Sequence, residues 1–354
     1  MPDLNFAVRD VILDRLAPLA EAIVAKQYSL EGEIWRVYGD LGREKSVRDA
    51  AYHLTYLGEA IAVSDPSLFC DYVAWAKVLF TNLHFPDEIL LTTLRCMAEV
   101  LGENLAPAHR TLALQYLEAA ERAFAQAPWA LPSFIGPDVP HGRLASGYLD
   151  ALLGGDRKAA WELVMEAIDS GVPVREIYLH VFQRTQHEIG RLWQLNRATV
   201  AQEHYCTAAT QLIMSQLYPS IFATQRVGRC LVGACVAGEM HEIGMRMVAD
   251  FLEMEGWDTY YLGANTPAES IIISVLEHGA DVLAISATLT AHLGAVADLI
   301  ALIRSHEPAM SVKIMVGGYP FNHSADLWRG MGADGCASDA QEAIRVAKGL
   351  ATGD

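Results

Sequence analysis

The sequence is poor in the features that mark several large classes of protein. Its 26 Lys and Arg residues are outnumbered by 43 Asp and Glu residues, which gives a formal net charge of -17. Binding to nucleic acid needs clustered Lys and Arg side chains that displace phosphate counterions, so we expect no nucleic-acid partner. No apolar stretch is long and uncharged enough to span a bilayer, so we expect no membrane partner. Charged residues also interrupt the first turns before a signal peptide could form, namely Asp3, Arg9, Asp10 and Asp14.

Cysteine is also scarce. The six cysteines include no CxxC pair and no spacing typical of a disulfide framework: Cys70, Cys96, Cys206, Cys230, Cys235 and Cys336. We therefore expect a reduced, cytoplasmic protein. A phosphate-binding GxGxxG loop and a nucleophile paired with a base are missing as well. The sequence therefore predicts no enzymatic activity of its own.

A chain of 354 residues exceeds what one hydrophobic core usually serves, so two or three domains are expected. The stretch QAPWALPSFIGPDVPHG contains four prolines and two glycines, which end any helix there. We predict a helical sensor domain over residues 1–126, a linker over 127–142, a four-helix cap over 143–226 and a sheet domain over 227–354.

Apolar residues at spacings of three and four predict helices in the first two domains. The expected helices cover 13–27, 47–63, 68–83, 88–105 and 110–126, then 143–155, 156–171, 174–196 and 199–222. Short polar joints between the last four indicate antiparallel neighbours in a four-helix bundle.

After residue 226 the period changes, because short apolar runs alternate with helical segments. The runs CLVGACVA, WDTYYLG, DVLAISAT, VKIMVGG and DGCAS predict five strands. This alternation is typical of a Rossmann-like α/β fold, a parallel sheet with helices on both faces. The expected fold is therefore multidomain: all-α, then a four-helix bundle, then α/β.

Ligands of such a sheet bind where the strands end, and polar residues gather at those positions. His241 follows the first strand within GEMHEIG, Ser286 and Thr288 end the third strand, and Gly317 and Gly318 end the fourth. A histidine two residues after a carboxylate suits metal ligation, since Glu239 could fix its tautomer. No second ligand is nearby in sequence, so His241 would bind a metal already held by a macrocycle.

These residues resemble a known signature. Glu239, His241 and Gly244 match the ExHxxG variant of the DxHxxG motif of cobalamin-binding domains, which implies that His241 is the lower cobalt ligand. The displaced nucleotide tail would lie in a slot beside the strands. The cofactor-binding residues implied in this domain are Glu239, Met240, His241, Glu242, Ile243, Gly244, Ser286, Thr288, Leu289, Gly317, Gly318 and Tyr319.

The cap sequence GRLWQLNRATVAQEHY resembles the cap of light-sensing repressors that use adenosylcobalamin as chromophore. That resemblance implies that Trp193, Val200, Glu203 and His204 surround the upper face of the cofactor. The plainer alternative is a core tryptophan and a solvated Glu203–His204 pair. Those repressors carry a histidine directly after the tryptophan, where this chain has Gln194. Either His204 or His187 would then take the upper cobalt position after light, or water would.

The N-terminal helices look like globin-like sensor domains, and the whole arrangement is similar to the photocobilins, which bind adenosylcobalamin and biliverdin. The candidate biliverdin-binding residues are Tyr52, His53, Tyr56, Tyr72, Trp75, His84 and Arg95, with Cys70 or Cys96 as thioether candidates. Alternatively these side chains fill or rim a helical core.

Three functions follow from these resemblances. The first is a light sensor in which loss of the adenosyl group shifts the cap, changes a homo-oligomer and signals to an unknown protein effector. The alternative is a corrinoid methyl-carrier protein for a methyltransferase system. The third is the cobalamin-binding part of a mutase, which would need a substrate barrel that this chain lacks. We expect the first.

Overall fold

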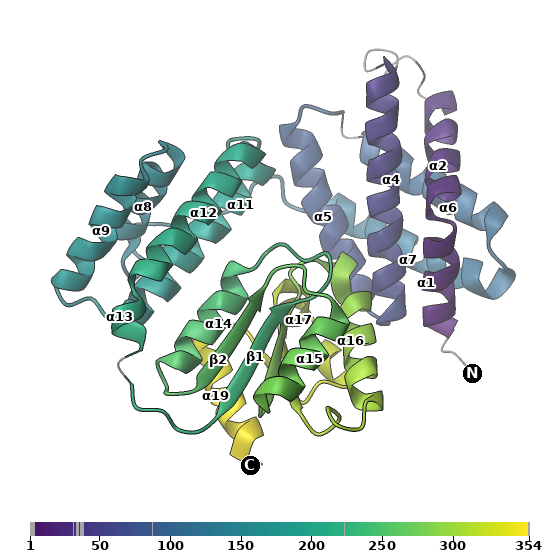
Figure 1. Ribbon diagram of the computed structural model, residues 1–354. Coiled ribbons are helices and arrows are strands. Elements are labelled where there is room, and N and C mark those ends of the chain that lie inside the picture. The colour runs from purple at the N-terminus through teal and green to yellow at the C-terminus, as the bar shows by residue number, and fades with distance from the viewer. Residues whose placement is uncertain are drawn as a thin grey trace. The chain divides into compact units, whose positions relative to one another are not determined.

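The computed structural model describes residues 4–30, 32, 35, 39–86, 88–222 and 224–352. Contacts divide the chain into two compact units. The first unit comprises residues 1–129, 289–294 and 323–330, and the second comprises 130–288, 295–322 and 331–354. The predicted cap and sheet therefore belong to the same unit (Figure 1).

The first unit is helical, as predicted. Its long helices are α1 (Leu4–Asp14), α2 (Leu16–Leu30), α4 (Gly39–Ala62), α5 (Pro66–Asn82), α6 (Glu88–Asn104) and α7 (Pro107–Gln126). Helix α4 packs against α1 and α2, and α5 packs against α7. The core contains fully buried Leu54, Leu57 and Phe69. Asp65 begins α5 by accepting the Ser67 amide hydrogen, with Pro66 in the first turn.

The second unit starts with helices that pack on one another: α8 (Gly142–Leu153), α9 (Arg157–Asp169), α10 (Val174–Glu176), η1 (Ile177–Phe182), α11 (Gln183–Gln194), α12 (Val200–Gln216) and α13 (Tyr218–Ile221). The name "cap" is used below for α8 to α13. Segments α10, η1 and α11 run on without a break, and η1 is a π-helical turn, a feature that often lies near functional sites. A reciprocal capping box of Thr199 and Gln202 begins α12.

The sheet has five parallel strands in the order β2-β1-β3-β4-β5. They are β1 (Cys230–Cys235), β2 (Asp258–Gly263), β3 (Val282–Ser286), β4 (Lys313–Gly317) and β5 (Gly335–Ala337), so all five predicted strands are confirmed. The order reverses between β1 and β3. In an open parallel sheet this reversal opens a crevice at the carboxyl ends of the strands.

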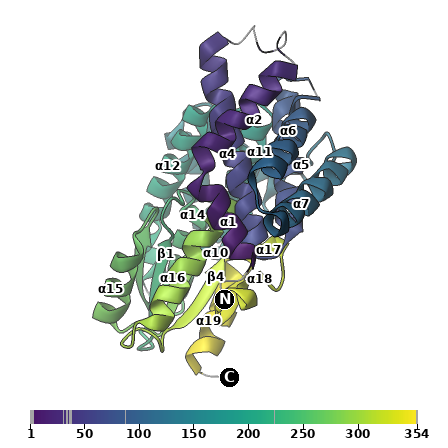
Figure 2. The ribbon, with the colours of Figure 1, turned by 90° about the vertical axis from the view of Figure 1, so that its right-hand side faces the viewer.

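Helices cover both faces of the sheet. They are α14 (Ile243–Glu253), α15 (Ala268–His278), α16 (Leu293–Ser305), α17 (Tyr319–His323) and α19 (Ala340–Thr352). The short segments η2 (Thr290–His292) and α18 (Leu327–Gly330) belong to the first unit. Helices α14 and α19 contact each other, whereas α15 and α16 lie side by side along the sheet in both views (Figures 1 and 2). Because both faces are covered, every residue of β3 is buried.

The cap and the sheet share one hydrophobic core. Tyr178 of η1 lies with its ring centroid 5.8 Å from that of Phe251 on α14, and both side chains are fully buried. The cap is therefore packed on the α14 side of the sheet domain. Among the residues that the structure describes, no helix is long and apolar enough to cross a membrane.

Candidate functional site

A cavity of about 580 Å³ lies between the cap and the carboxyl ends of the strands, entirely within the second unit. Its cap side is lined by Gln183, Gln186, His187, Gly190, Trp193, Val200, Glu203 and Thr207. Its sheet side is lined by residues of the β1–α14 loop, of α14 and α19, and of the ends of β3, β4 and β5. Most of the predicted cofactor-binding positions therefore line a single space, except His204, Glu239 and Leu289.

The central feature of the cavity is the pair formed by His241 and Glu239. Nδ1 of His241 lies 2.5 Å from Oε1 of Glu239, and the same oxygen accepts the His241 amide hydrogen at 2.9 Å. The Glu239 side chain is fully buried, whereas 55% of the His241 side chain is exposed. The hydrogen bond to Glu239 raises the pKa of His241 above its ordinary value. This bond engages Nδ1 and leaves Nε2 of His241 available as a ligand atom.

The loop that carries the pair is held from two sides. The Glu239 carboxyl group also accepts the Thr288 amide hydrogen at 2.6 Å, which ties the loop to the end of β3. Asn265 lies in the β2–α15 loop, and its side-chain Oδ1 accepts the Gly238 amide hydrogen at 2.8 Å. The backbone amide of Asn265 donates to the Glu239 carbonyl oxygen at 2.9 Å. The role of Asn265 could not be predicted from the sequence, because its partners Gly238 and Glu239 lie far away along the chain.

The neighbouring carboxyl group, Glu242, is turned toward the cap and β2. Its Oε1 accepts from Nε2 of Gln211 at 2.6 Å, and its Oε2 accepts from the Tyr261 hydroxyl at 2.7 Å and the Ala264 amide at 3.1 Å. Burial, and then the contact with Glu242, raise the pKa of Tyr261 well above its ordinary value. Glu242 therefore lines the cavity while joining three separate elements.

Glycines shape the sheet side of the cavity. Gly318 has a φ of +113°, and an added Cβ would lie 2.0 Å from the Ala287 carbonyl oxygen, so only glycine fits there. An added Cβ at Gly244 meets nothing within 4 Å, although Gly244 lines the cavity. The Gly244 backbone therefore leaves room for a ligand to approach.

One part of the cavity lining is apolar and comes from the sheet and from helices α14 and α19. The name "slot" is used below for this part, which is lined by Met247, Val248, Ala284, Met315, Ala337, Ala340 and Ala343. The resemblance to cobalamin-binding domains predicts a slot beside the strands, but it does not identify these residues. A run of alanines in helices and strands gives the same pattern as ordinary core packing.

On the cap side, the cavity is lined by the predicted residues Trp193, Val200 and Glu203. His187 lines the cavity as well. The Thr207 hydroxyl lies 3.1 Å from Oε1 of Glu203. The ring of His187 lies 5.3 Å from that of Phe134, and burial lowers the pKa of His187. Its imidazole is therefore biased toward the neutral form.

Four residues that the sequence places at the upper or lower side of the cofactor lie outside the cavity lining, namely Gln194, His204, Glu239 and Leu289, and Glu239 is buried behind His241. The His204 side chain is 74% exposed, and its Nδ1 lies 2.6 Å from Oε2 of Glu203. Gln194 is buried. Of the two histidines considered for the upper cobalt position, only His187 lines the cavity.

The candidate biliverdin residues divide into two groups. His53, Tyr56, Tyr72 and Trp75 form one aromatic cluster, in which His53 Nδ1 lies 2.8 Å from the Tyr72 hydroxyl and the rings of Tyr56 and Tyr72 stack at 3.8 Å. Burial lowers the pKa of His53 to about 4. Tyr52, His84 and Arg95 are exposed and form the second group, and Trp75 at the edge of the cluster is also 38% exposed. Biliverdin binding stays a prediction.

The residues of the cavity fit a cobalamin. Among the described parts of the chain, no group of three or more His, Cys, Asp or Glu side chains could hold a metal ion. Within the described residues, His241 therefore suits a metal that brings its other ligands with it, as a corrin does. Open space beside Gly244 suits the ring, and the apolar slot suits a flat aromatic tail.

Comparison with known proteins agrees with this fit. Two family models, each described as a B12 binding domain, match residues 144–218 and 229–347. The chain is similar to dimethylamine corrinoid proteins 1 and 3 of Methanosarcina acetivorans. The first is 28% identical over 57% of this chain and 90% of the relative, and the second is 30% identical over 53% and 90%.

A solved structure gives a similar result. The monomethylamine corrinoid protein of Methanosarcina barkeri matches with a TM-score of 0.53 and 25% identity, over 58% of this chain and 98% of that one. Residues 1–143 lie outside both family matches. The cofactor is therefore a cobalamin. The predicted light-sensing function is wrong, because the similar proteins are corrinoid proteins named for methylamines.

Proposed function

The chain belongs to the corrinoid-protein family, and on that premise we propose that it is a methyl carrier that exchanges a methyl group with partner methyltransferases. The observation that carries the proposal is His241, oriented by a buried carboxyl group and facing a cavity beneath a helical cap. The names of the relatives support methylated amines as the source of the methyl group.

Two residues of the chain would hold the cofactor from below. Nε2 of His241 would bind the cobalt, and Glu239 would accept the hydrogen of Nδ1, which fixes the tautomer and strengthens the imidazole as a ligand. When bound, the corrin supplies a cobalt centre that can accept and release a methyl group. The Thr288 and Asn265 contacts hold Glu239 in place during that exchange.

The cap would shield the upper face. Trp193 and Val200 present apolar surface to the cavity, and Gln186, Glu203 and Thr207 add a small polar group beside it. No cavity residue forms a nucleophile–base pair in the described contacts. The chain would therefore carry the methyl group, while a partner methyltransferase breaks the bond to the amine.

The experiment is a replacement assay. Purified protein is loaded with cobalamin, reduced, and mixed with dimethylamine and the methyltransferase that serves the Methanosarcina acetivorans dimethylamine corrinoid protein. We expect up to one monomethylamine per loaded chain. His241→Ala should lower the yield strongly, whereas His306→Ala, a change at an exposed histidine of the second unit, should not. No monomethylamine with the loaded wild-type protein, in an assay where the natural corrinoid protein works, would overturn the proposal for this donor.

A further inference from the structure

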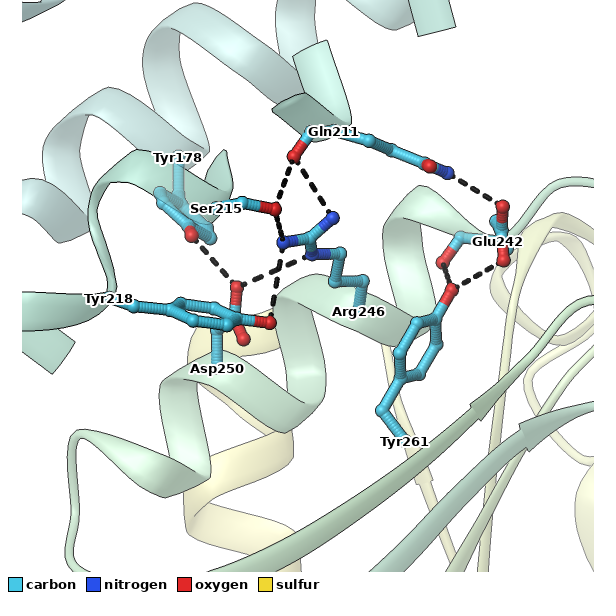
Figure 3. Close-up of polar contacts among 8 residues, drawn as sticks. All are labelled: Tyr178, Gln211, Ser215, Tyr218, Glu242, Arg246, Asp250 and Tyr261. Atoms are coloured by element: carbon cyan, nitrogen blue, oxygen red, sulfur yellow. Dashed lines mark hydrogen bonds and ion pairs between the residues drawn. The ribbon is translucent and has the colours of Figure 1, made fainter. Parts of the chain in front are cut away.

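Polar contacts tie the cap to the sheet domain along helix α14, and most of them gather around Arg246 (Figure 3). Its guanidinium donates to the Gln211 carbonyl at 3.0 Å, the Ser215 hydroxyl at 2.7 Å and the Tyr218 hydroxyl at 3.3 Å. One turn further along, Asp250 lies 4.0 Å from Arg246 and accepts from the Tyr178 hydroxyl at 2.8 Å.

These contacts of Arg246 and Asp250, called the Arg246 cluster below, are largely buried. The side chains of Arg246 and Asp250 are 10% and 9% exposed, and the Tyr178 ring packs on Phe251 beneath them. Breaking it would leave a buried charge without its partners, which is costly. Further from the cavity, Arg175 of the cap also pairs with Glu255, which is shared with Lys348 of α19. Away from the cavity, the interface between the cap and the sheet domain therefore has several buried or shared polar contacts.

Close to the cavity, the described polar contact between the cap and the sheet domain is weaker. The Gln211 side chain donates one hydrogen bond to Glu242, at 2.6 Å, and both side chains are only half-buried. Glu242 directly follows His241 and directly precedes α14, so this bond joins cap helix α12 to the loop that carries the candidate cobalt ligand. Figure 3 shows Gln211 with its carbonyl turned to Arg246 and its amide turned to Glu242.

We propose that Glu242 is a positioning residue: with Gln211 it forms a latch that holds the cap over the cavity, and the Arg246 cluster is the pivot about which the cap opens. The inference rests on the proposed function, because a carrier must uncover the upper face of its cofactor for a partner. Tyr261 and the Ala264 amide hold the Glu242 carboxyl group in place from the sheet side. Opening the cavity end would then break the charge-assisted hydrogen bond between Gln211 and Glu242, whereas the bonds of Arg246 to Ser215 and Tyr218, and of Asp250 to Tyr178, would remain.

The test exchanges the two partners of the latch. Gln211→Glu places two carboxylates against each other and should open the latch. The double variant Gln211→Glu, Glu242→Gln restores one donor and one acceptor, and the new Gln can still accept from Tyr261 and Ala264. Gln216→Glu adds the same charge at an exposed position of α12 and serves as the control. If Gln211→Glu fails to fold, Gln211→Met removes the hydrogen bond without adding charge.

The readout is the distance between spin labels on the cap and on the sheet domain, attached through a keto amino acid at positions 158 and 277. Both positions are exposed, in α9 and α15. We expect Gln211→Glu or Gln211→Met to raise the ratio of long to short distances roughly tenfold or more, as the loss of a hydrogen bond to a charged group implies. The double variant and Gln216→Glu should match the wild type.

Unchanged distances in Gln211→Glu and Gln211→Met would overturn the latch, and so would a double variant that stays as open as Gln211→Glu. The distances are recorded with and without cobalamin and without any methyl donor. They therefore decide the latch alone, whereas the replacement assay decides the carrier function alone.

Discussion

His241 and Glu239 form a 2.5 Å hydrogen bond in which the histidine is half-exposed to the cavity and the glutamate is completely buried. The buried partner cannot turn away, because its second oxygen accepts from the Thr288 amide. The imidazole is therefore oriented before any cofactor arrives. Preorganisation of this kind removes a cost that binding would otherwise have to meet.

Glu239→Gln should weaken cobalamin binding without unfolding the protein. The amide keeps an oxygen for the Thr288 amide hydrogen but no longer provides a charged acceptor for Nδ1 of His241. Loss of such an orienting partner typically costs roughly tenfold to a hundredfold in metal affinity. Titration with cobalamin, followed by absorbance, measures the affinity. An affinity equal to that of the wild type would contradict the role given to Glu239.

Two glycine substitutions should separate stability from binding. Gly318→Ala forces a Cβ against the Ala287 carbonyl at a left-handed backbone position, so we expect a loss of about 2 kcal/mol or more in unfolding free energy. Gly244→Ala meets no protein atom within 4 Å, so the fold should be unaffected while cobalamin affinity falls. Thermal unfolding and cobalamin titration of both variants check this. A Gly244→Ala protein with wild-type affinity would show that the ring lies elsewhere.

Filling the slot should discriminate between corrinoids. Ala343 is fully buried and lines the slot, so Ala343→Leu should obstruct a nucleotide tail. Cobinamide has no such tail and serves as the internal control. We expect cobalamin affinity to fall at least tenfold more than cobinamide affinity. Equal losses for both would mean either that the tail does not occupy the slot or that the whole site has collapsed, and circular dichroism separates these two outcomes.

Asp250 should make stability depend on pH. Burial raises its pKa from the ordinary 3.8 to about 6. The folded protein therefore holds this proton more tightly than the unfolded chain, so the stabilisation present below pH 3.8 is lost as the pH rises through 6. The effect is of the order of 2 to 3 kcal/mol.

Asp250→Asn removes that titration but keeps an acceptor for the Tyr178 hydroxyl. The midpoint of cap–sheet unfolding in the variant, relative to the wild type, should rise between pH 4.5 and pH 7.5. Thermal unfolding in matched buffers follows it. A difference between variant and wild type that is constant over this range would contradict the account of Asp250.

The regular elements of the second unit could be predicted from the sequence. Each of the five apolar runs is a strand, and each lies within two residues of its expected end, because a parallel sheet covered on both faces needs nearly continuous apolar strands. The position of His241 in the loop after β1 followed from the rule that ligands bind at the carboxyl ends of the strands. These features depend on local pattern, which a single sequence carries.

The contacts between distant segments could not be predicted. Gln211 and Glu242 are 31 residues apart, and Tyr178 and Asp250 are 72 apart, with no local pattern that links them. The alanines of the slot look like any small core residues. The function was also misjudged, because Trp193 and Glu203 suggested a ligand for the upper face that the relatives do not support. The residues that line this cavity define its shape, but they do not fix the reaction in which its ligand takes part.

The central claim is that His241 ligates the cobalt of a bound cobalamin, and one spectrum tests it directly. Protein labelled with ¹⁵N only in histidine is loaded with unlabelled cobalamin, reduced to the Co(II) state and examined by electron paramagnetic resonance. If His241 is the ligand, the nitrogen splitting changes from a triplet to a doublet on labelling, and the doublet is absent in His241→Ala. A triplet that persists in the labelled protein would mean that the cofactor's own base holds the cobalt, and would contradict the account.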